Sequence, residues 1–546
     1  MKNDKLALLG DEAVALGAIH AGLSAAYGYP GTPSSEIMQY LINEFNRGGP
    51  VARWCANEKT ALEAALGVSF AGRRALVTTK HVGLNVASDP LINAALLKIK
   101  GGLVIAVADD PGMHSSQNEQ DSRFYSSFAM IPCLEPGCQQ EAYEMVREAF
   151  DVSEKFNIPV LIRLVTRLAH SRAAVVTQKA RAQNPVEKTT EKSKWTLIPS
   201  FARKNYEALL EKQNLLQSWS SGNKANKLTG GSGDLAVITS GIAGNYYEEN
   251  LDDFLALRRK KGKKAPIHLH IGAYPLPKKI IQKVCDEADE ILIIEEGQPF
   301  ISQMIFGIKE DVKHVIQAGE LDPDNVRKIL GLPPLKGINI DKNRQAMLAA
   351  LQNAQRPPVL CHGCPHIDSY NSINKAVAAL DPRPGHPDVG INSDIGCYSL
   401  GVAPPLSAVE SIVCMGACVG MAKGASDAGL KHAIAVIGDS TFIHSGITPL
   451  IDAVDAGTTM TLIILDNSSV AMTGCQPTIL PSERLKSLLI GCGVKNERIL
   501  ELEAKPNLVD ANAVKLKDEI LQEGVSVVIF KRVCLEALRK NKKENF

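Results

Sequence analysis

Two groups of polar residues in the last third of the chain have the spacing of a metal and phosphate site. Gly438-Asp439-Ser440 end one apolar run, and twenty-six residues separate Ser440 from Asn467, which ends the next. Because neighbouring parallel strands end at the same edge of a sheet, we expect Asp439 and Asn467 to share one rim. Their side-chain oxygens and the main-chain carbonyl of Ser469 suit Mg²⁺, which proteins usually hold together with substrate phosphates.

The residues around this pair favour a phosphate ligand. Gly438 lets the backbone approach a ligand closely, and the N-terminus of the following helix can receive phosphate oxygens. The alternative is an ordinary strand–turn–helix in which Asp439 only caps the helix. The matching polar end of the second run favours the metal and diphosphate interpretation.

Four of the twelve cysteines could perform metal or thiol chemistry. Cys361 and Cys364 form a CxxC motif, Cys397 follows in an IGC sequence, and Cys534 comes after the last apolar run. Four thiolates are what an iron–sulfur cluster needs, but a CxxC motif also suits zinc or a redox pair, and simple packing is a further alternative. The other cysteines are interpreted as small buried residues, among them Cys133, Cys138, Cys414 and Cys418.

Short apolar runs rich in β-branched residues alternate with longer helical patterns along nearly the whole chain. The runs cover residues 74–80, 101–110, 157–167, 233–241, 290–297, 432–440, 459–467 and 525–530. Runs that are apolar on both faces are typical of strands buried in a parallel sheet between helices. They predict the α/β class, with several doubly wound units whose strand ends position the polar residues.

The composition is that of a multidomain globular protein. The length of 546 residues suggests three or four domains, and 60 Lys and Arg balance 59 Asp and Glu. This balance gives no electrostatic reason to expect nucleic acid or an anionic membrane as the main partner. The sequence shows no apolar run long enough to span a membrane and no secretory signal, so we expect a cytoplasmic enzyme with reduced cysteines.

Two changes in composition suggest domain boundaries. Residues 176–232 are rich in Lys, Asn, Gln and Ser and are predicted to connect two domains through some helix, and residues 352–360 form a second linker. The predicted parts are therefore domains at 1–175, 233–345 and 356–535, with a solvated tail at 536–546.

Several segments carry a resemblance to a known family. They are GYPGTPSSEI (28–37), NEKTALEAALG (57–67), TTKHVGLNVASDP (78–90), ADDPGMHSSQNEQDSR (108–123), CHGCPH (361–366), SDIGCYSLG (393–401) and GDSTFIHSG (438–446). With them the chain resembles the 2-oxoacid:ferredoxin oxidoreductases, and most closely the large (alpha) subunits of the indolepyruvate ferredoxin oxidoreductases. The spacing from Asp439 to Asn467 also resembles the thiamine diphosphate motif.

The resemblance implies three doubly wound domains. A pyrimidine-binding domain would cover 1–175, a transketolase C-terminal-like domain 233–345 and a pyrophosphate-binding domain 356–535. It also implies a reaction: oxidative decarboxylation of a 2-oxoacid, such as the arylpyruvate indolepyruvate, on thiamine diphosphate and Mg²⁺ with coenzyme A. The products would be an acyl-CoA, CO₂ and reduced ferredoxin or another reduced acceptor.

The resemblance further implies partners and a redox centre. The partners would be a smaller (beta) subunit, in a heterotetramer or other hetero-oligomer, and ferredoxin or a separate electron-carrier subunit. The centre would be one [4Fe–4S] cluster on Cys361, Cys364, Cys397 and Cys534.

Roles for single residues follow from their positions in the matching motifs. Glu58 is the expected proton-relay carboxylate that activates the cofactor, with Glu63 as the second choice, and Thr32, His81 and His444 are expected at the substrate. The cofactor contacts are predicted to be Glu58, Gly396, Gly438, Asp439, Ser440, Thr441, Asn467 and Thr473. The structural alternatives are that Glu58 is an ordinary first-turn helix residue and that each histidine serves packing.

The candidates for binding the substrate carboxylate lie in the matching segment 108–123. Ser115, Gln117 and Asp121 are candidates to line the same cleft, and Arg123 is the candidate arginine for the carboxylate. None of these residues stands in an unambiguous arginine-clamp motif.

The chain departs from the family pattern in two features. CHGCPHID differs from the CPGCPHR of the family, and we expect the C-terminal ferredoxin-like domain to be absent. Either a separate subunit carries the electrons, or the reaction is a non-redox lyase, carboligase or decarboxylase reaction on thiamine diphosphate, with an acyl-CoA as one conceivable substrate. A scaffold subunit without catalysis is a third alternative, against which the presence of Glu58, Asp439 and Asn467 argues.

Overall fold

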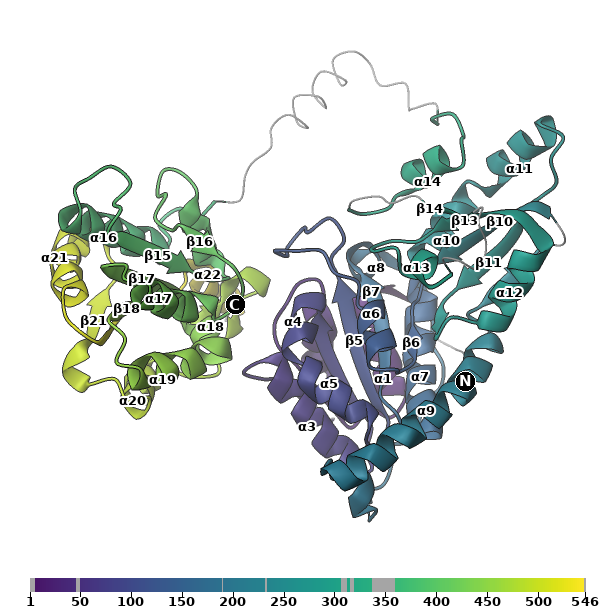
Figure 1. The fold of residues 1–546 in the computed structure, drawn as a ribbon, viewed down its shortest axis with the longest axis horizontal. Coiled ribbons are helices and arrows are strands. Elements are labelled where there is room, and N and C mark those ends of the chain that lie inside the picture. The colour runs from purple at the N-terminus through teal and green to yellow at the C-terminus, as the bar shows by residue number, and fades with distance from the viewer. Residues whose placement is uncertain are drawn as a thin grey trace. The chain divides into compact units, whose positions relative to one another are not determined.

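The computed structural model describes residues 5–45, 50–188, 190–230, 233–305, 312–314, 319–335 and 359–544 (Figure 1). The chain forms two compact units, Met1–Ile338 and Asn339–Phe546. Both contain mainly parallel sheets with helices on their faces, so the predicted α/β class is confirmed.

The first unit contains a seven-stranded sheet of order β12-β6-β7-β5-β4-β2-β3, parallel except for the antiparallel pair of β12 and β6. Its strands are β2 (Ala25–Gly28), β3 (Val51–Trp54), β4 (Ala75–Lys80), β5 (Leu103–Asp109), β6 (Cys133–Leu134), β7 (Val160–Val165) and β12 (Ala273–Tyr274). All seven residues of β5 are buried, as expected for a strand covered on both faces.

Helices cover both faces of this sheet. One hydrophobic cluster joins it to α1 (Gly10–His20), α2 (Ser35–Phe45) and α7 (Gln139–Phe156). The other joins it to α3 (Glu58–Phe70), α4 (His81–Val86) and α5 (Ser88–Ala95). The short α6 (Arg123–Phe128) and α8 (Thr166–His170) follow β5 and β7, and an antiparallel pair of β1 (Lys5–Leu9) and β8 (Arg172–Val176) lies beside α1.

The same unit holds a second sheet of order β14-β13-β10-β11-β9. Its strands are β9 (Lys227–Thr229), β10 (Gly233–Ser240), β11 (Ile267–Ile271), β13 (Ala288–Ile294) and β14 (Val312–His314), of which only β9 is antiparallel to its neighbour. Its helices are α10 (Ile242–Glu249), α11 (Leu251–Lys260), α12 (Lys278–Glu287), α13 (Phe300–Ile305) and α14 (Pro323–Ile329). The predicted connecting helix is α9 (Pro199–Ser221).

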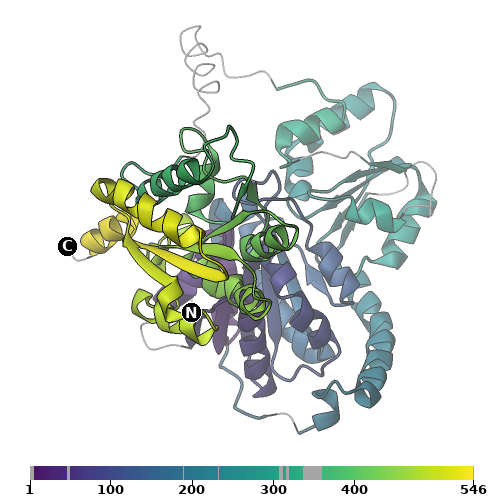
Figure 2. The same ribbon diagram turned by 60° about the vertical axis from the view of Figure 1, so that its left-hand side comes forward.

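The second unit contains a six-stranded, fully parallel sheet of order β16-β15-β17-β18-β22-β21 (Figure 2). Its strands are β15 (Val389–Ser393), β16 (Ser411–Ile412), β17 (His432–Gly438), β18 (Met460–Asp466), β21 (Ile499–Glu503) and β22 (Val525–Lys531). Helices α16 (Pro365–Leu380) and α21 (Val509–Ile520) pack on one face. The other face carries α17 (Ala417–Asp427), α19 (Ile447–Asp455) and α20 (Ser482–Gly491), and α22 (Leu535–Glu544) follows β22.

All eight apolar runs singled out in the sequence form strands, namely β4, β5, β7, β10, β13, β17, β18 and β22. The sheets at 25–165 and 227–314 belong to one compact unit, because β12 extends the first sheet and polar side chains join the two. Most of the linker expected at 352–360 lies outside the described residues. Within the described parts of the chain, no helix is both long and apolar enough to cross a membrane.

Candidate active site

The turn after β2 is fixed by hydrogen bonds at the carboxyl end of the first sheet. The Gly31 N–H donates to Ser35 Oγ at 2.9 Å, and the Ser34 hydroxyl donates to the Gly31 carbonyl at 2.8 Å. The Ser115 hydroxyl, in the loop after β5, donates to the Thr32 carbonyl at 3.1 Å. Thr32 is therefore held between two loops and is half-buried. Its predicted contact with the substrate stays a prediction.

Glu58 is a protected carboxylate at the start of a helix. It is the first residue of α3, whose N-cap Asn57 accepts a hydrogen bond from the Thr60 N–H at 2.9 Å, and it is only 4% exposed. A Cβ on Gly83 of α4 would lie 2.3 Å from Glu58 Oε1, so only glycine allows this close approach. Glu63, the second choice from sequence, is exposed and forms an ion pair with Lys59, so Glu58 fits a shielded proton relay better.

His81 lies beneath the loop that follows β5. It is buried, and its Nε2 is 3.0 Å from the carbonyl oxygen of Asn118. Its Nδ1 is buried and has no hydrogen-bond partner among the described residues. This arrangement makes His81 a support for residues 110–120, and a direct substrate contact by His81 stays a prediction.

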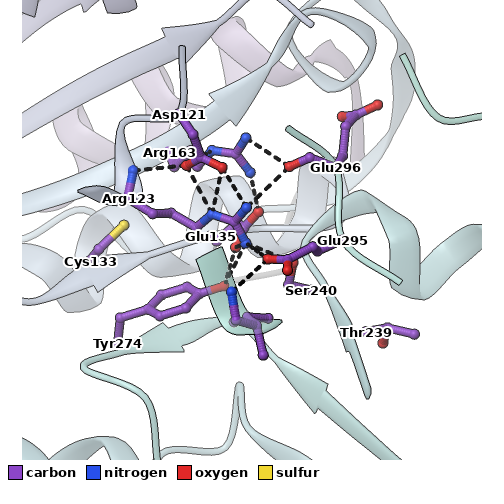
Figure 3. A network of polar contacts seen from close by, with 12 residues as sticks. Asp121, Arg123, Cys133, Glu135, Arg163, Thr239, Ser240, Tyr274, Glu295 and Glu296 are labelled. Atoms are coloured by element: carbon purple, nitrogen blue, oxygen red, sulfur yellow. Dashed lines mark hydrogen bonds and ion pairs between the residues drawn. The ribbon is translucent and has the colours of Figure 1, made fainter. Parts of the chain in front are cut away.

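Arg123 is occupied in a buried ionic network, so its assignment to the substrate carboxylate is wrong (Figure 3). Its guanidinium binds Asp121, with Nε to Oδ1 at 2.9 Å, and reaches Glu295 Oε2 at 3.0 Å. Asp121 is also 3.5 Å from Arg163. Both Asp121 and Arg123 are buried and join β13 to the loop after β5, whereas Ser115 and Gln117 in that loop are exposed.

In the second unit, Asp439 and Asn467 lie on one rim, as the spacing predicts. Gly438 at the end of β17 pairs with Leu465 of β18, which places the two strand ends side by side. Asp439 accepts hydrogen bonds from the N–H groups of Ser440 and Ser468, both at 2.8 Å. The Ser469 N–H donates to Asn467 Oδ1 at 3.0 Å.

Asp466, which the sequence analysis missed, adds a second carboxylate to this rim. Burial, and next the nearby charge of Asp466, raise the pKa of Asp439 to about 8. Asp466 Oδ1 accepts from the Ser482 hydroxyl at 2.8 Å, but its buried Oδ2 has no hydrogen-bond donor among the described residues. Two buried carboxyl groups this close require a shared proton or a cation, so the rim fits Mg²⁺. The signal was present in the sequence as the Asp directly before Asn467.

The remaining predicted cofactor contacts in the second unit lie around the strand ends. Gly396 and Gly438 both lie against the Tyr398 ring, because a Cβ there would lie 2.3 Å and 2.6 Å from Tyr398 Cε1. The Thr441 hydroxyl donates to the Ile395 carbonyl at 3.1 Å, which joins the loops after β15 and β17. Thr473 instead donates its hydroxyl hydrogen to Gln476 at 2.7 Å.

His444 lies in a π-helical turn, Phe442–Gly446, between α18 (Asp439–Thr441) and α19. It is buried, and its Nδ1 is 2.5 Å from the Ser445 hydroxyl. Single π-helical turns inside helices are frequent at functional sites. The position close after the Asp439 rim is compatible with the predicted substrate contact.

The four cysteines chosen from sequence line one pocket, which we call the cysteine pocket. Its volume is about 100 Å³. The lining residues are Val359, Leu360, Cys361, Cys364, Pro365, His366, Cys397, Leu400, Asn467, Ala471, Cys534, Leu535 and Glu536. Burial and the neighbouring thiols raise the pKa of Cys364 to about 11 and that of Cys397 to about 12.

The cysteine pocket borders the rim that carries Asp439 and Asn467. Asn467 belongs to both, and its Nδ2 is 3.2 Å from Nε2 of His366. In the parts of the chain that the structure describes, no group of three or more His, Cys, Asp or Glu is already arranged around a metal position. Cys475, missed in the sequence analysis, lies close enough to Cys397 to affect its pKa. All twelve cysteines are free thiols, and Cys414 is exposed, so its assignment as a buried residue is wrong.

Comparisons with known families find a thiamine diphosphate-binding region in each of the two units. Residues 16–218 match the family described as pyruvate flavodoxin/ferredoxin oxidoreductase, thiamine diphosphate-binding. Residues 394–489 match the C-terminal thiamine pyrophosphate-binding domain of thiamine pyrophosphate enzymes. Fold and site therefore define the class: the protein is a thiamine diphosphate-dependent oxidoreductase of 2-oxoacids.

Full-length relatives identify the family within this class. The chain is 36% identical to indolepyruvate oxidoreductase subunit IorA of Archaeoglobus fulgidus, over 98% of this chain and 87% of the relative. It is 34% identical to the subunit of the same name of Methanothermobacter thermautotrophicus, over 98% of this chain and 87% of the relative. The chain belongs to the family of indolepyruvate oxidoreductase IorA subunits.

A solved structure shows a similar fold. It is the 2-oxoglutarate:ferredoxin oxidoreductase from Magnetococcus marinus with 2-oxoglutarate, coenzyme A and succinyl-CoA bound. The sequence identity is 18% and the TM-score 0.50, with 60% of this chain and 66% of that chain covered.

Proposed function

We propose that this chain is the large subunit of an enzyme that oxidatively decarboxylates an arylpyruvate, such as indolepyruvate, with coenzyme A. The products are an arylacetyl-CoA, CO₂ and reduced ferredoxin or another reduced acceptor. The names of the full-length relatives support the arylpyruvate, and the ligands in the similar solved structure support coenzyme A.

The residues at the two strand-end sites fit the two ends of thiamine diphosphate. Asp439, Asn467 and the carbonyl of Ser469 would hold Mg²⁺ with the diphosphate, and Ser440 and Thr441 lie at the start of the adjacent helix. Glu58 would bind the aminopyrimidine ring. When bound, thiamine diphosphate supplies a nucleophilic carbon for the 2-oxo group and accepts the electrons left when CO₂ departs.

The residues of the first unit handle the proton and the substrate. The buried Glu58, in the first turn of α3, would hold a proton at the pyrimidine nitrogen. Thr32 orients a substrate oxygen. His81 holds the loop at 110–120 over this region through its contact with Asn118. His444 of the second unit is a candidate donor to the substrate carbonyl.

One observation favours the oxidative reaction over a non-redox lyase or carboligase. Asn467 lines the cysteine pocket and also belongs to the rim that carries Asp439. A cluster on Cys361, Cys364, Cys397 and Cys534 would therefore lie beside the diphosphate of the cofactor and could receive single electrons. A non-redox lyase reaction releases no electrons and therefore does not require an iron–sulfur cluster beside the cofactor.

The expected assembly is a hetero-oligomer with a smaller subunit, and ferredoxin or an electron-carrier subunit accepts the electrons. The reducing environment of the cytoplasm keeps cysteines free, and we place the enzyme there.

Binding of thiamine diphosphate to the anaerobically purified complex tests the proposal. Wild-type protein should bind it only with Mg²⁺, and Asp439→Ala should abolish binding because the metal loses its carboxylate. Asp452→Ala removes an exposed carboxylate of α19 and is the matched control. Magnesium-independent binding, or equal binding by Asp439→Ala, would contradict the proposed site.

A further inference from the structure

Lys80 crosses the turn that carries Thr32. It is the last residue of β4, and its side chain lies against Gly31, where a Cβ would be 2.9 Å from Lys80 Cδ. Its ammonium donates a hydrogen bond to the Ser115 carbonyl at 2.8 Å. The hydroxyl of the same serine binds the Thr32 carbonyl, so Lys80, Thr32 and Ser115 form one cluster.

Two carboxylates near Lys80 favour the charged form of its ammonium. Asp110 and Glu58 are the acidic groups that act on it. Asp110 accepts hydrogen bonds from Thr166 and Ser116, at 2.8 Å and 2.7 Å, and its pKa is lowered, so it stays ionised. Burial lowers the pKa of Lys80 to about 8, against the attraction of these two carboxylates.

A 2-oxoacid brings another negative charge to this place. Glu58 and Asp110 repel a substrate carboxylate, and such a group needs a cation to be held out of bulk water. Arg123 cannot supply it, because its guanidinium is buried and bound by Asp121 and Glu295 (Figure 3). Lys80 is the cation that the structure brings to the Thr32 turn.

We propose that Lys80 binds the carboxylate of the 2-oxoacid substrate. This inference rests on the proposed function and names the residue that selects for an oxoacid over a neutral carbonyl compound. An ammonium has three donors, and the Ser115 carbonyl uses one of them. The other donors can reach a carboxylate oxygen without the planar match that an arginine requires.

The test compares Lys80→Gln with the wild type and with Lys59→Gln, which removes an exposed charge on α3. Phenylpyruvate is the substrate probe, and phenylacetone, the same molecule with a methyl group in place of the carboxylate, is the competitive inhibitor. The holoenzyme is assayed anaerobically with coenzyme A and methyl viologen, and thiamine diphosphate affinity is measured in parallel.

Lys80→Gln should raise the KM for phenylpyruvate by roughly 10- to 100-fold, the loss of one hydrogen bond between charged groups. The inhibition constant of phenylacetone and the thiamine diphosphate affinity should stay within about twofold of the wild type. Lys80→Arg, which keeps the charge, should give a lower KM than Lys80→Gln, and Lys59→Gln should match the wild type.

Two results would overturn the inference: an unchanged KM in Lys80→Gln, or an equal weakening of phenylpyruvate and phenylacetone, which would mean that Lys80 only shapes the loop. A wild type that does not turn over any arylpyruvate would instead contradict the proposed function.

Discussion

Two side chains of the first unit, Glu58 and Lys80, are close enough to interact electrostatically and have different proposed roles. Glu58 is shielded at the start of α3 and has Gly83 directly against its carboxylate. Lys80 lies across the Thr32 turn. In the proposed mechanism the Glu58 carboxylate serves the cofactor and the Lys80 ammonium binds the substrate, and each role can be tested separately.

Glu58→Gln should keep the shape of the side chain but remove its ability to hold a proton. We expect thiamine diphosphate affinity within a few-fold of the wild type and a fall in kcat of roughly 10²- to 10⁴-fold. Steady-state kinetics and calorimetric binding measure the two effects. Glu63→Gln, at the exposed pair with Lys59, is the control and should leave both unchanged. Unchanged turnover in Glu58→Gln would place the proton relay elsewhere.

The affinity for an arylpyruvate should also depend on pH through Lys80. Its pKa is lowered to about 8, so its charge is present below this pH and is lost above it. The carboxylates of Asp110 and Glu58 face Lys80 and raise its pKa, against the larger lowering effect of burial. The KM for phenylpyruvate should therefore be flat below pH 7 and rise up to about tenfold per pH unit above pH 8. A KM that falls with rising pH would exclude this role.

At the scale of structural elements, three segments bring cysteines to the cysteine pocket. They are the N-terminus of α16, the turn at Cys397–Val402 and the segment after β22. Cys534→Ser should reduce the iron content of the anaerobically purified protein strongly and remove its brown absorption, while thiamine diphosphate binding persists. Cys492→Ser, buried at the end of α20, is the control. An iron-free wild type would contradict the cluster at once.

A buried carboxylate beside the network between the two sheets of the first unit lowers stability: that of Glu296, whose main-chain carbonyl accepts from Arg123 and Arg163. Burial raises the pKa of Glu296 to about 7 from its ordinary 4.5. The unfolded chain therefore loses this proton at lower pH than the folded chain does, and stability falls as pH rises through this window. Glu296→Gln should stabilise the protein at pH 8 by up to about 3 kcal/mol and have little effect near pH 4.5.

Thermal unfolding at the two pH values measures this effect. Gln keeps an oxygen that can accept the hydrogen bond now made from the Leu321 N–H at 2.7 Å. The control is Glu287→Gln, at a partly exposed position on α12. A destabilised Glu296→Gln variant at pH 8 would show that its charge is needed by Arg163.

The strands were predictable from sequence because runs apolar on both faces leave only the buried parallel arrangement. The rim of Asp439 and Asn467 was predictable for a related reason, since adjacent strand ends must meet. The buried ion pairs of Arg123 were not predictable, because its partners, such as Glu295, come from an element about 170 residues away. Lys80 was also missed, because its proximity to the Thr32 turn depends on packing against Gly31.

For the whole molecule, each of the two units contains a region that matches a thiamine diphosphate-binding family. Membership in the IorA family spans 98% of the chain, so both units belong to one enzyme subunit. The oxidative reaction reduces an electron acceptor for each 2-oxoacid consumed, whereas a lyase reaction needs no acceptor. The product balance therefore distinguishes the two reactions.

The most direct measurement is the product balance of the anaerobically purified complex with indolepyruvate, coenzyme A and methyl viologen. The proposed reaction gives one CO₂, one indoleacetyl-CoA and two reduced viologens for each indolepyruvate consumed, and it stops when the viologen is left out. Release of CO₂ with an aldehyde or a carboligation product, at the same rate with and without viologen, would contradict it.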